Sequence, residues 1–275
     1  MFNRTTETRP PADHQRLRTR RAARIAAVLT ATAACATATT GSAGAIVGGQ
    51  DSTERYGFMV SIPMVNDNGH CGGSLIAPQW VVTAAHCVVP EPDAPESELT
   101  GKVRVGSEKR TSGGAVRAIA RIVGHPKYDP RNIQSAYDIA LVKLDRPVTQ
   151  KPVRIADKAG PAGTATRAVG WGTTKDDAFV MPMRLQQVGL RTVPARDCKG
   201  ISAKRELCQR GQVAGTMACG GDSGGPLLQR ARDGKRWELI GATSRDGDDS
   251  EACSTGPGIW TNVPAYRTWI AKHTA

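Results

Sequence analysis

Short apolar runs separated by turn-forming residues are the feature that most constrains how this 275-residue chain can fold. Glycine, proline and aspartate lie between the runs, which span residues 101–105, 115–123, 138–144, 167–172, 184–193 and 237–243. Runs of this length with turn residues between them are typical of strands in an all-β protein. Helical spacing appears only near the C-terminus, where Val263, Tyr266, Trp269 and Ile270 recur. The sequence therefore predicts an all-β barrel or sandwich followed by one docked amphipathic helix.

Composition sets the size of the core and excludes one class of partner. A hydrophobic content of 39% can bury a large core, in one domain or in two closely packed halves. The formal net charge is +12, but the lysines and arginines are scattered and aromatic residues make up only 4%. Nucleic-acid recognition usually combines a basic patch with aromatic side chains, so we expect no nucleic-acid partner.

Residues 1–45 differ in composition from the rest of the chain. Several arginines, Arg16 to Arg24 among them, precede a modestly apolar stretch at 25–36, and small residues follow up to Ala45. This order is typical of a secretory signal peptide, either alone or followed by a short propeptide. The apolar stretch is shorter than the ~20 residues that a membrane span needs. We therefore expect a secreted, extracellular protein without stable membrane insertion of the mature chain, with a lipoprotein anchored at Cys35 as the alternative.

Cysteine usage agrees with export. Of the seven cysteines, Cys35 lies in the leader, which leaves an even number in residues 46–275. An even count suits disulfides in an oxidising compartment, although the sequence alone leaves their pairing open.

One glycine-rich segment, residues 220–228 (GGDSGGPLL), places a hydroxyl where chemistry can occur. Glycines on both sides of Ser223 permit backbone conformations closed to other residues and leave room for a substrate carbonyl. If the N–H groups of Gly221 and Ser223 converge, they form a donor pair for a developing oxyanion. The segment therefore predicts a nucleophile with its own oxyanion hole, although such residues also occur in ordinary loops.

A serine nucleophile needs a base, and the base needs an orienting group. His86 is the histidine embedded in an apolar run, at 80–87 (WVVTAAHC), which predicts a buried strand that enters a corner fixed by Cys87. Asp138 opens the apolar run at 138–144 (DIALVKL), where a buried carboxylate requires a partner. These two residues are the candidate base and orienting acid.

Taken together, these segments resemble the chymotrypsin-like (trypsin-like) serine peptidases, with the histidine, aspartate and serine motifs in that family's order. The resemblance covers residues 46–275 and rests on IVGG at 46–49, TAAHC at 83–87, DIALVKL at 138–144 and GDSGGP at 221–226. It implies that Ser223 is the nucleophile, His86 the general base and then acid, and Asp138 the residue that orients the imidazole. It also implies an oxyanion hole formed by Gly221 and Ser223.

The resemblance implies an architecture more specific than the apolar runs do. The family folds as two six-stranded antiparallel β-barrels with the active site in the cleft between them and a C-terminal helix. We place residues 46–155 in the first barrel, 156–260 in the second and 263–273 in the helix. The crossover is expected near 150–165, where proline and glycine cluster.

Two further features follow from the resemblance. The pairing it implies for the cysteines is Cys71–Cys87, Cys198–Cys208 and Cys219–Cys253. It also implies that cleavage after Ala45 frees the ammonium of Ile46 to form a buried pair with Asp222, which shapes the oxyanion hole. Two routes to that cleavage stay open, because signal peptidase could cut directly after Ala45 or could cut earlier, for instance after Ala38, and leave a propeptide for another protease.

The expected substrate pocket departs from the family pattern. Trypsins carry an aspartate six positions before the nucleophile, where this chain has Met217, so we expect no strict preference for arginine or lysine before the scissile bond. Ser244, Asp246 and Gly258 are the other predicted substrate-binding residues. Arg245 and Asp246 follow Ser244 in place of the family's usual Trp-Gly, and the acidic loop that continues from Asp246 either is simply solvated or favours basic substrates from the rim.

The function expected from the sequence is that of a secreted serine endopeptidase that works through an acyl-enzyme intermediate. We expect protein or peptide substrates, proteinaceous inhibitors as potential partners, a monomer, and neither a cofactor nor a catalytic metal. The alternative is a non-catalytic binding protein on a peptidase scaffold, which the altered pocket keeps open.

Overall fold

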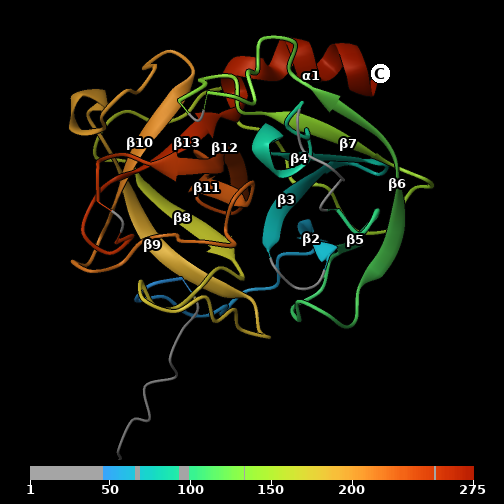
Figure 1. The fold of residues 1–275 in the computed structure, drawn as a ribbon, viewed down its shortest axis with the longest axis horizontal. Helices are drawn as coiled ribbons and strands as arrows, with labels where there is room; N and C mark the ends of the chain where they lie inside the picture. The colour runs from blue at the N-terminus through green and yellow to red at the C-terminus, as the bar shows by residue number, and fades with distance from the viewer. Residues whose placement is uncertain (1–45, 66–68, 93–98, 133, 251) are drawn as a thin grey trace, which may run out of the picture. The chain divides into compact units, whose positions relative to one another are not determined.

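The computed structural model describes residues 46–65, 69–92, 99–132, 134–250 and 252–275, and the predicted signal peptide lies outside these residues. Figure 1 shows two β-barrels side by side. The strands of the first barrel are β2 (Met59–Pro63), β3 (His70–Ala77), β4 (Trp80–Thr83), β5 (Lys102–Val105), β6 (Ala115–Gly124) and β7 (Ala140–Leu144). They close in the order β2-β3-β4-β7-β6-β5, and every pairing is antiparallel.

The second barrel follows after a connection that runs from residue 145 to 164. Its strands are β8 (Ala165–Gly170), β9 (Gln186–Val193), β10 (Glu206–Gly211), β11 (Pro226–Arg230), β12 (Trp237–Asp246) and β13 (Gly258–Asn262). They run in the order β9-β10-β13-β12-β11-β8, and pairing of β8 with β9 closes the barrel. The predicted fold class, two six-stranded antiparallel barrels with a C-terminal helix, is confirmed.

The short elements lie at corners and at the ends of the chain. They are the two-residue strand β1 (Gln50–Asp51), the 3-10 helices η2 (Ala85–Cys87), η3 (Ala195–Asp197) and η4 (Val263–Tyr266), and the helix α1 (Arg267–Thr274). Among the described residues, no helix is both long and apolar enough to span a membrane.

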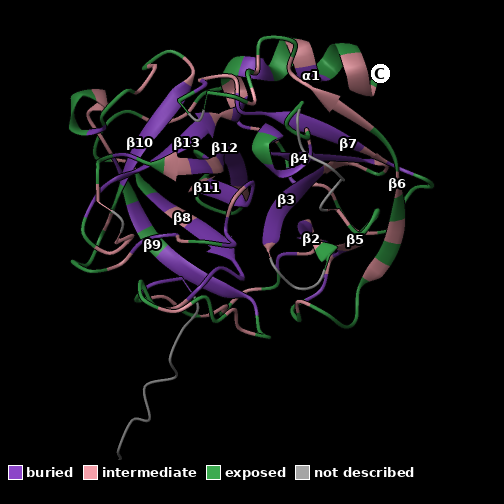
Figure 2. Cartoon of the chain, viewed as in Figure 1, coloured by how far each residue is buried: buried purple, intermediate pink, exposed green. Residues whose placement is uncertain are grey.

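Alternation along the strands divides the core into layers, because successive side chains of a strand point to opposite faces. In β7, Ala140, Val142 and Leu144 pack inside the first barrel. Leu141 instead joins an apolar cluster that draws on both barrels. Figure 2 shows the resulting pattern, with the strands of both barrels mostly buried and β6 exposed along the outer edge.

The ends of the described chain each pack on the barrel that is distant in sequence. β1 pairs with β9, so the segment that begins at Ile46 adds to the second barrel. At the other end, the Tyr266 hydroxyl donates to the Ala136 carbonyl at 2.6 Å, and Tyr266 and Trp269 pack against His125 of the first barrel. The two barrels are therefore joined by their terminal segments as well as by the connection between them.

Candidate active site

His86 and Asp138 come together where two first-barrel segments meet. Strand β4 ends at Thr83, and η2 then turns the His86 side chain outward, while Asp138 lies just before β7, which pairs with β4. His86 Nδ1 lies 2.8 Å from Asp138 Oδ2, and the His86 main-chain N–H donates to Asp138 Oδ1 at 2.9 Å. The two bonds fix the plane of the imidazole ring. The His86 side chain remains 35% exposed, so its other nitrogen stays accessible.

The Asp138 carboxylate is buried but well supported. Burial alone would raise its pKa, but hydrogen bonds and charge from His86, with a hydrogen bond from Ser244, outweigh burial and lower the pKa below its ordinary value. The Ser244 hydroxyl donates to Asp138 Oδ2 at 2.6 Å, and the Thr261 hydroxyl donates to the Asp138 carbonyl at 2.7 Å. Because Ser244 and Thr261 belong to β12 and β13, the second barrel holds an acid that the first barrel supplies.

Ser223 lies in the turn before β11, and this turn packs tightly against the first barrel. The Gly72 N–H donates to the Ser223 carbonyl at 2.7 Å. Gly224 has φ +72, and a Cβ there would clash with Thr83 Oγ1 and the Ala84 nitrogen. A glycine at 224 is therefore required both by the backbone conformation and by the close approach of the two barrels.

The same turn leaves two backbone donors free. Gly221 has φ +91, and within the described chain neither the Gly221 nor the Ser223 N–H donates a hydrogen bond. The Gly221–Asp222 peptide between them is held on both sides, because its carbonyl accepts from His70 Nδ1 at 2.9 Å and its N–H donates to the Cys219 carbonyl at 3.0 Å. Two unpaired N–H groups beside a serine hydroxyl suit the binding of an oxyanion.

His70 is a buried residue of the site that the sequence motifs do not identify, because it follows the turn-forming residues Asn68 and Gly69. It is 3% exposed, and it bridges the Gly221 carbonyl and the Ser61 hydroxyl, 3.0 Å from its Nε2. Burial lowers the pKa of His70 to about 4. The imidazole is then neutral near pH 7, so Nδ1 donates to the carbonyl and Nε2 accepts from Ser61. The only signal in the sequence was its position next to the buried run that starts at Cys71.

Ile46 and Asp222 meet at Gly172. The Ile46 N–H donates to the Gly172 carbonyl at 3.3 Å, and the Gly172 N–H donates to Asp222 Oδ1 at 2.8 Å. Asp222 Oδ2 accepts from the Cys219 N–H at 3.0 Å. In the uncut chain the Ile46 nitrogen is an amide, and burial raises the pKa of Asp222 to about 7. Ile46 is fully buried with φ +68, a conformation that β-branched residues rarely adopt.

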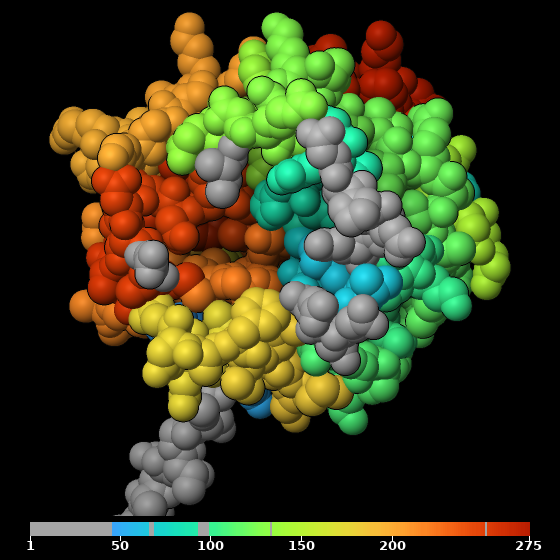
Figure 3. Space-filling view, viewed as in Figure 1, coloured from blue at the N-terminus to red at the C-terminus, as the bar shows by residue number. Residues whose placement is uncertain are grey.

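A cavity of about 680 Å³ lies where the candidate catalytic residues meet. His86, Asp138 and Ser223 line it, together with the predicted substrate-binding residues Ser244, Asp246 and Gly258. Figure 3 shows the molecule hollowed between the teal surface of the first barrel and the orange and red surface of the second. Among the described residues, no hydrogen bond joins Ser223 Oγ to His86, a bond that often forms only when substrate is present.

The structure places Met217 behind the cavity wall. The residue is 2% exposed and packs in an apolar cluster with Ile46 and Trp260, and its Sδ lies beside Gly258. Ala218 and Trp260 form the nearby lining instead.

The acids that line the cavity were only partly identified from the sequence. They are Glu91, Asp138, Asp246, Asp248 and Asp249. Partial burial and the charges of Asp248 and Asp176 raise the pKa of Asp246. Asp249 is paired with Lys199, whose Nζ lies 2.6 Å from its Oδ2.

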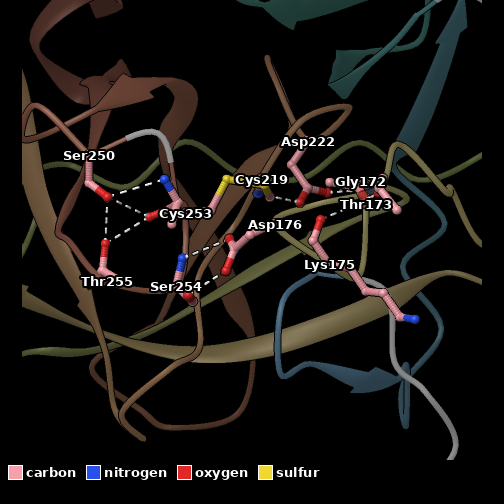
Figure 4. The surroundings of a disulfide bond; sticks show 12 residues. Gly172, Thr173, Lys175, Asp176, Cys219, Asp222, Ser250, Cys253, Ser254 and Thr255 are labelled. Atoms are coloured by element: carbon pink, nitrogen blue, oxygen red, sulfur yellow. Dashed lines mark hydrogen bonds between the residues drawn. A yellow bond between two sulfur atoms is a disulfide. The ribbon is translucent and has the colours of Figure 1, made fainter.

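Three disulfides brace the site, and their pairing is the one that the resemblance implies: Cys71–Cys87, Cys198–Cys208 and Cys219–Cys253. Figure 4 shows how Cys219–Cys253 ties the serine turn to the loop after β12. There Asp176 accepts hydrogen bonds from the N–H and hydroxyl of Ser254. Among the described residues, the two clusters with ligand-type side chains close enough for a metal are His86 with Cys71 and Cys87, and Asp176 with Cys219 and Cys253. In both clusters the cysteines form a disulfide, which offers no thiolate to a metal.

Comparison with known proteins gives one consistent family. The sequence model of the family described as Trypsin matches residues 46–270. Trypsin 5G1 of Aedes aegypti is 32% identical, over 84% of this chain and 85% of its own length. Trypsin of Sarcophaga bullata is 34% identical, over 83% and 89%. The Suppressor of tumorigenicity 14 protein homolog of Bos taurus is 32% identical over 82% of this chain, which corresponds to 28% of that longer protein.

The fold, the spacing of the site residues and these matches agree along nearly the whole described chain. The chain belongs to the trypsin family of serine peptidases.

Proposed function

We propose that this protein is a secreted serine endopeptidase in which Ser223, His86 and Asp138 form the catalytic triad. The observation that carries the proposal is their convergence on one cavity beside two unpaired N–H groups, those of Gly221 and Ser223. A binding protein has no need for this combination of an oriented imidazole, a hydroxyl and free amide donors.

The chemistry follows from the geometry. Ser223 Oγ attacks the substrate carbonyl while His86 Nε2 takes its proton, and the Gly221 and Ser223 N–H groups stabilise the oxyanion. Asp138 keeps Nδ1 protonated and stabilises the imidazolium without taking its proton. The C–N bond then breaks as His86 returns the proton to the leaving amine, which leaves an acyl-enzyme. Water attacks the acyl group by the same route, releases the carboxylic acid product and restores Ser223.

Activation depends on the bond between Ala45 and Ile46. Cleavage there turns the Ile46 amide into an ammonium close to the buried Asp222 carboxyl, because both groups already bond to Gly172. A residue at the start of a chain has no preceding carbonyl, so cleavage also removes the restriction that makes φ +68 unfavourable at Ile46. The proposed signal peptide ends at this bond, and direct release by signal peptidase is the simpler of the two routes.

Substrate choice follows from the residues that stand where trypsins carry their pocket aspartate. Ala218, Gly258 and Trp260 line the cavity there and Met217 lies behind them, so an apolar surface takes the place of that carboxylate. We propose that small or apolar residues precede the scissile bond. Asp246 and Asp248 belong to the rim in this interpretation.

Active-site labelling tests the proposed chemistry. We expect a fluorophosphonate probe to label the processed protein, and Ser223→Ala to abolish labelling and lower kcat by about a millionfold. His86→Ala should fail in the same way while the protein stays folded by circular dichroism. A processed, folded protein that the probe does not label would instead indicate the non-catalytic binding protein.

Two measurements test the remaining parts. N-terminal sequencing of the active secreted form should begin at Ile46, and an active form that begins earlier would contradict the activation step. A peptide-library cleavage profile should show small or apolar residues before the cut, and a dominant arginine or lysine would contradict the role given to Met217.

A further inference from the structure

The Arg245 side chain is buried and fixed in place by several contacts, unlike a charged residue that is simply solvated. Its guanidinium pairs with Glu206 of β10, and the two side chains are only 6% and 0% exposed. Arg245 Nε also donates to Gln134 Oε1 at 3.2 Å, and Nη2 to the Gly200 carbonyl at 3.5 Å. Contacts from three segments thus fix the planar group where it lines the cavity.

A β-bulge in β12 places the side chains of the adjacent residues Ser244 and Arg245 close together. The register between β12 and β13 shifts between Thr243 and Arg245, which leaves Ser244 as the extra residue. In a regular strand adjacent side chains point to opposite faces, but a bulge re-aims one of them. Arg245 Nη1 consequently lies 3.4 Å from Ser244 Oγ.

This contact determines the direction of the Ser244 hydroxyl. A guanidinium can only donate, so Ser244 Oγ must accept from Arg245. The single hydroxyl proton is then left for Asp138 Oδ2, 2.6 Å away. A chain of contacts therefore leads from Glu206 through Arg245 and Ser244 to the carboxylate that orients His86.

We propose that Arg245, fixed by Glu206, is a positioning residue that turns the Ser244 hydroxyl toward Asp138 and so sets the protonation of the His86–Asp138 couple. The inference rests on the proposed serine peptidase function. It assigns a role in the chemistry to the arginine that stands where the family usually has tryptophan.

Other ionisable groups near His86 and Asp138 do not account for a difference in the protonation of this pair between the variants. Burial and the charges of Asp138, Glu91 and Asp129 raise the pKa of Tyr128 to about 12, so Tyr128 stays neutral near pH 7. Glu91, Asp246 and Asp248 line the same cavity but remain unchanged in the variants below. Differences between variants then report the contact of Arg245 with Ser244.

The test is the pH dependence of the labelling rate with a small dialkyl fluorophosphate, which needs no knowledge of the specificity pocket. The main variant is Arg245→Met with Glu206→Met, because removing the arginine alone would leave a buried, unpaired carboxylate. Without a guanidinium to orient Ser244, the hydroxyl donates less to Asp138 and the couple takes up a proton more readily. We expect the midpoint of the acid limb to rise by roughly half a pH unit.

Two comparisons make the test specific. In a Ser244→Ala background, the paired Arg245 and Glu206 substitutions should produce no additional shift, because the hydroxyl they act through is absent. The matched control is Lys199→Met with Asp249→Asn, which removes another ion pair at the same cavity without touching Ser244 and should leave the acid limb in place.

The outcomes separate the two proposals. An unshifted acid limb in the folded, labelled Arg245 and Glu206 variant would overturn the positioning role, and so would a shift of the same size in the Ser244→Ala background. Failure of the unsubstituted processed protein to react with the probe would instead overturn the proposed peptidase function.

Discussion

At the scale of single residues, the sequence motifs located the groups that meet at the cavity but not the groups that hold them. His86, Asp138 and Ser223 stood out because each lies in a distinctive local segment. His70 did not, because its partners Gly221 and Ser61 come from distant parts of the chain. Glu206 and Arg245 likewise look like two ordinary surface charges until folding buries them together.

His70→Ala tests whether the histidine positions the oxyanion donors. Loss of the Nδ1–H bond frees the Gly221–Asp222 peptide to rotate, which misplaces the neighbouring N–H groups. We expect kcat to fall by about tenfold or more with little change in KM, since removal of a whole oxyanion donor costs about a hundredfold or more. Steady-state kinetics with an ester substrate would measure both constants.

Ser61→Ala is the matched comparison for His70. It removes the outer hydrogen bond at Nε2, together with the 3.3 Å contact of the Ser61 hydroxyl with the Arg110 carbonyl, and leaves the bond to Gly221 in place. Its kcat should therefore fall less than that of His70→Ala. Equal kcat values for folded His70→Ala and the unsubstituted enzyme would refute the positioning role.

At the scale of secondary-structure elements, several of the apolar runs predicted strands correctly. The runs at 101–105, 115–123 and 138–144 correspond to β5, β6 and β7. The strand β10 (Glu206–Gly211) was not predicted, because two of its buried residues are polar. Gln209 is fully buried, accepts from Thr166 at 2.7 Å and donates to Thr192 at 3.0 Å. Only the assembled barrel supplies these partners, so no local pattern could reveal the strand.

Gln209→Leu should destabilise the second barrel because it leaves the Thr166 and Thr192 hydroxyls buried without their partner. We expect the free energy of unfolding to drop by about 1–3 kcal/mol in urea titrations of the mature Ser223→Ala protein. Replacing all three residues together, as Thr166→Val, Thr192→Val and Gln209→Met, should lower it less than the single change. A larger loss in the triple variant would show that packing, and not hydrogen bonding, sets the stability of this layer.

At the scale of the whole molecule, the start of the described chain and the serine turn share one buried polar site. The raised pKa of Asp222, from 3.8 to about 7, means that the uncut folded chain favours the protonated carboxyl. This stabilisation is present below the ordinary pKa and is lost as the pH rises toward 7. In the proposed mature form the Ile46 ammonium would favour the carboxylate, so we expect the pH dependence to reverse its sign.

Melting temperatures of uncut and mature Ser223→Ala protein, measured from pH 4 to pH 7, test this reversal. The uncut chain should lose stability relative to the mature form as the pH rises, by several degrees over the range. All other titrating groups of residues 46–275 are common to both proteins, so the difference reports Asp222 and its partner together with Glu7, Asp13 and His14, which only the uncut chain carries. Parallel curves for the two forms would contradict the activation pair.

Each barrel is completed by a terminal segment that belongs to the other half of the sequence, and this affects what happens if the chain is cut into two fragments. β1 adds to β9 of the second barrel, and Tyr266 and Trp269 pack against His125 of the first. A cut in the connection after β7 would produce two fragments, each of which carries a piece that belongs on the other. Neither fragment is a self-sufficient unit, but each would recognise its complement. The protein is thus suited to fragment complementation, in which peptidase activity would report that two halves have met.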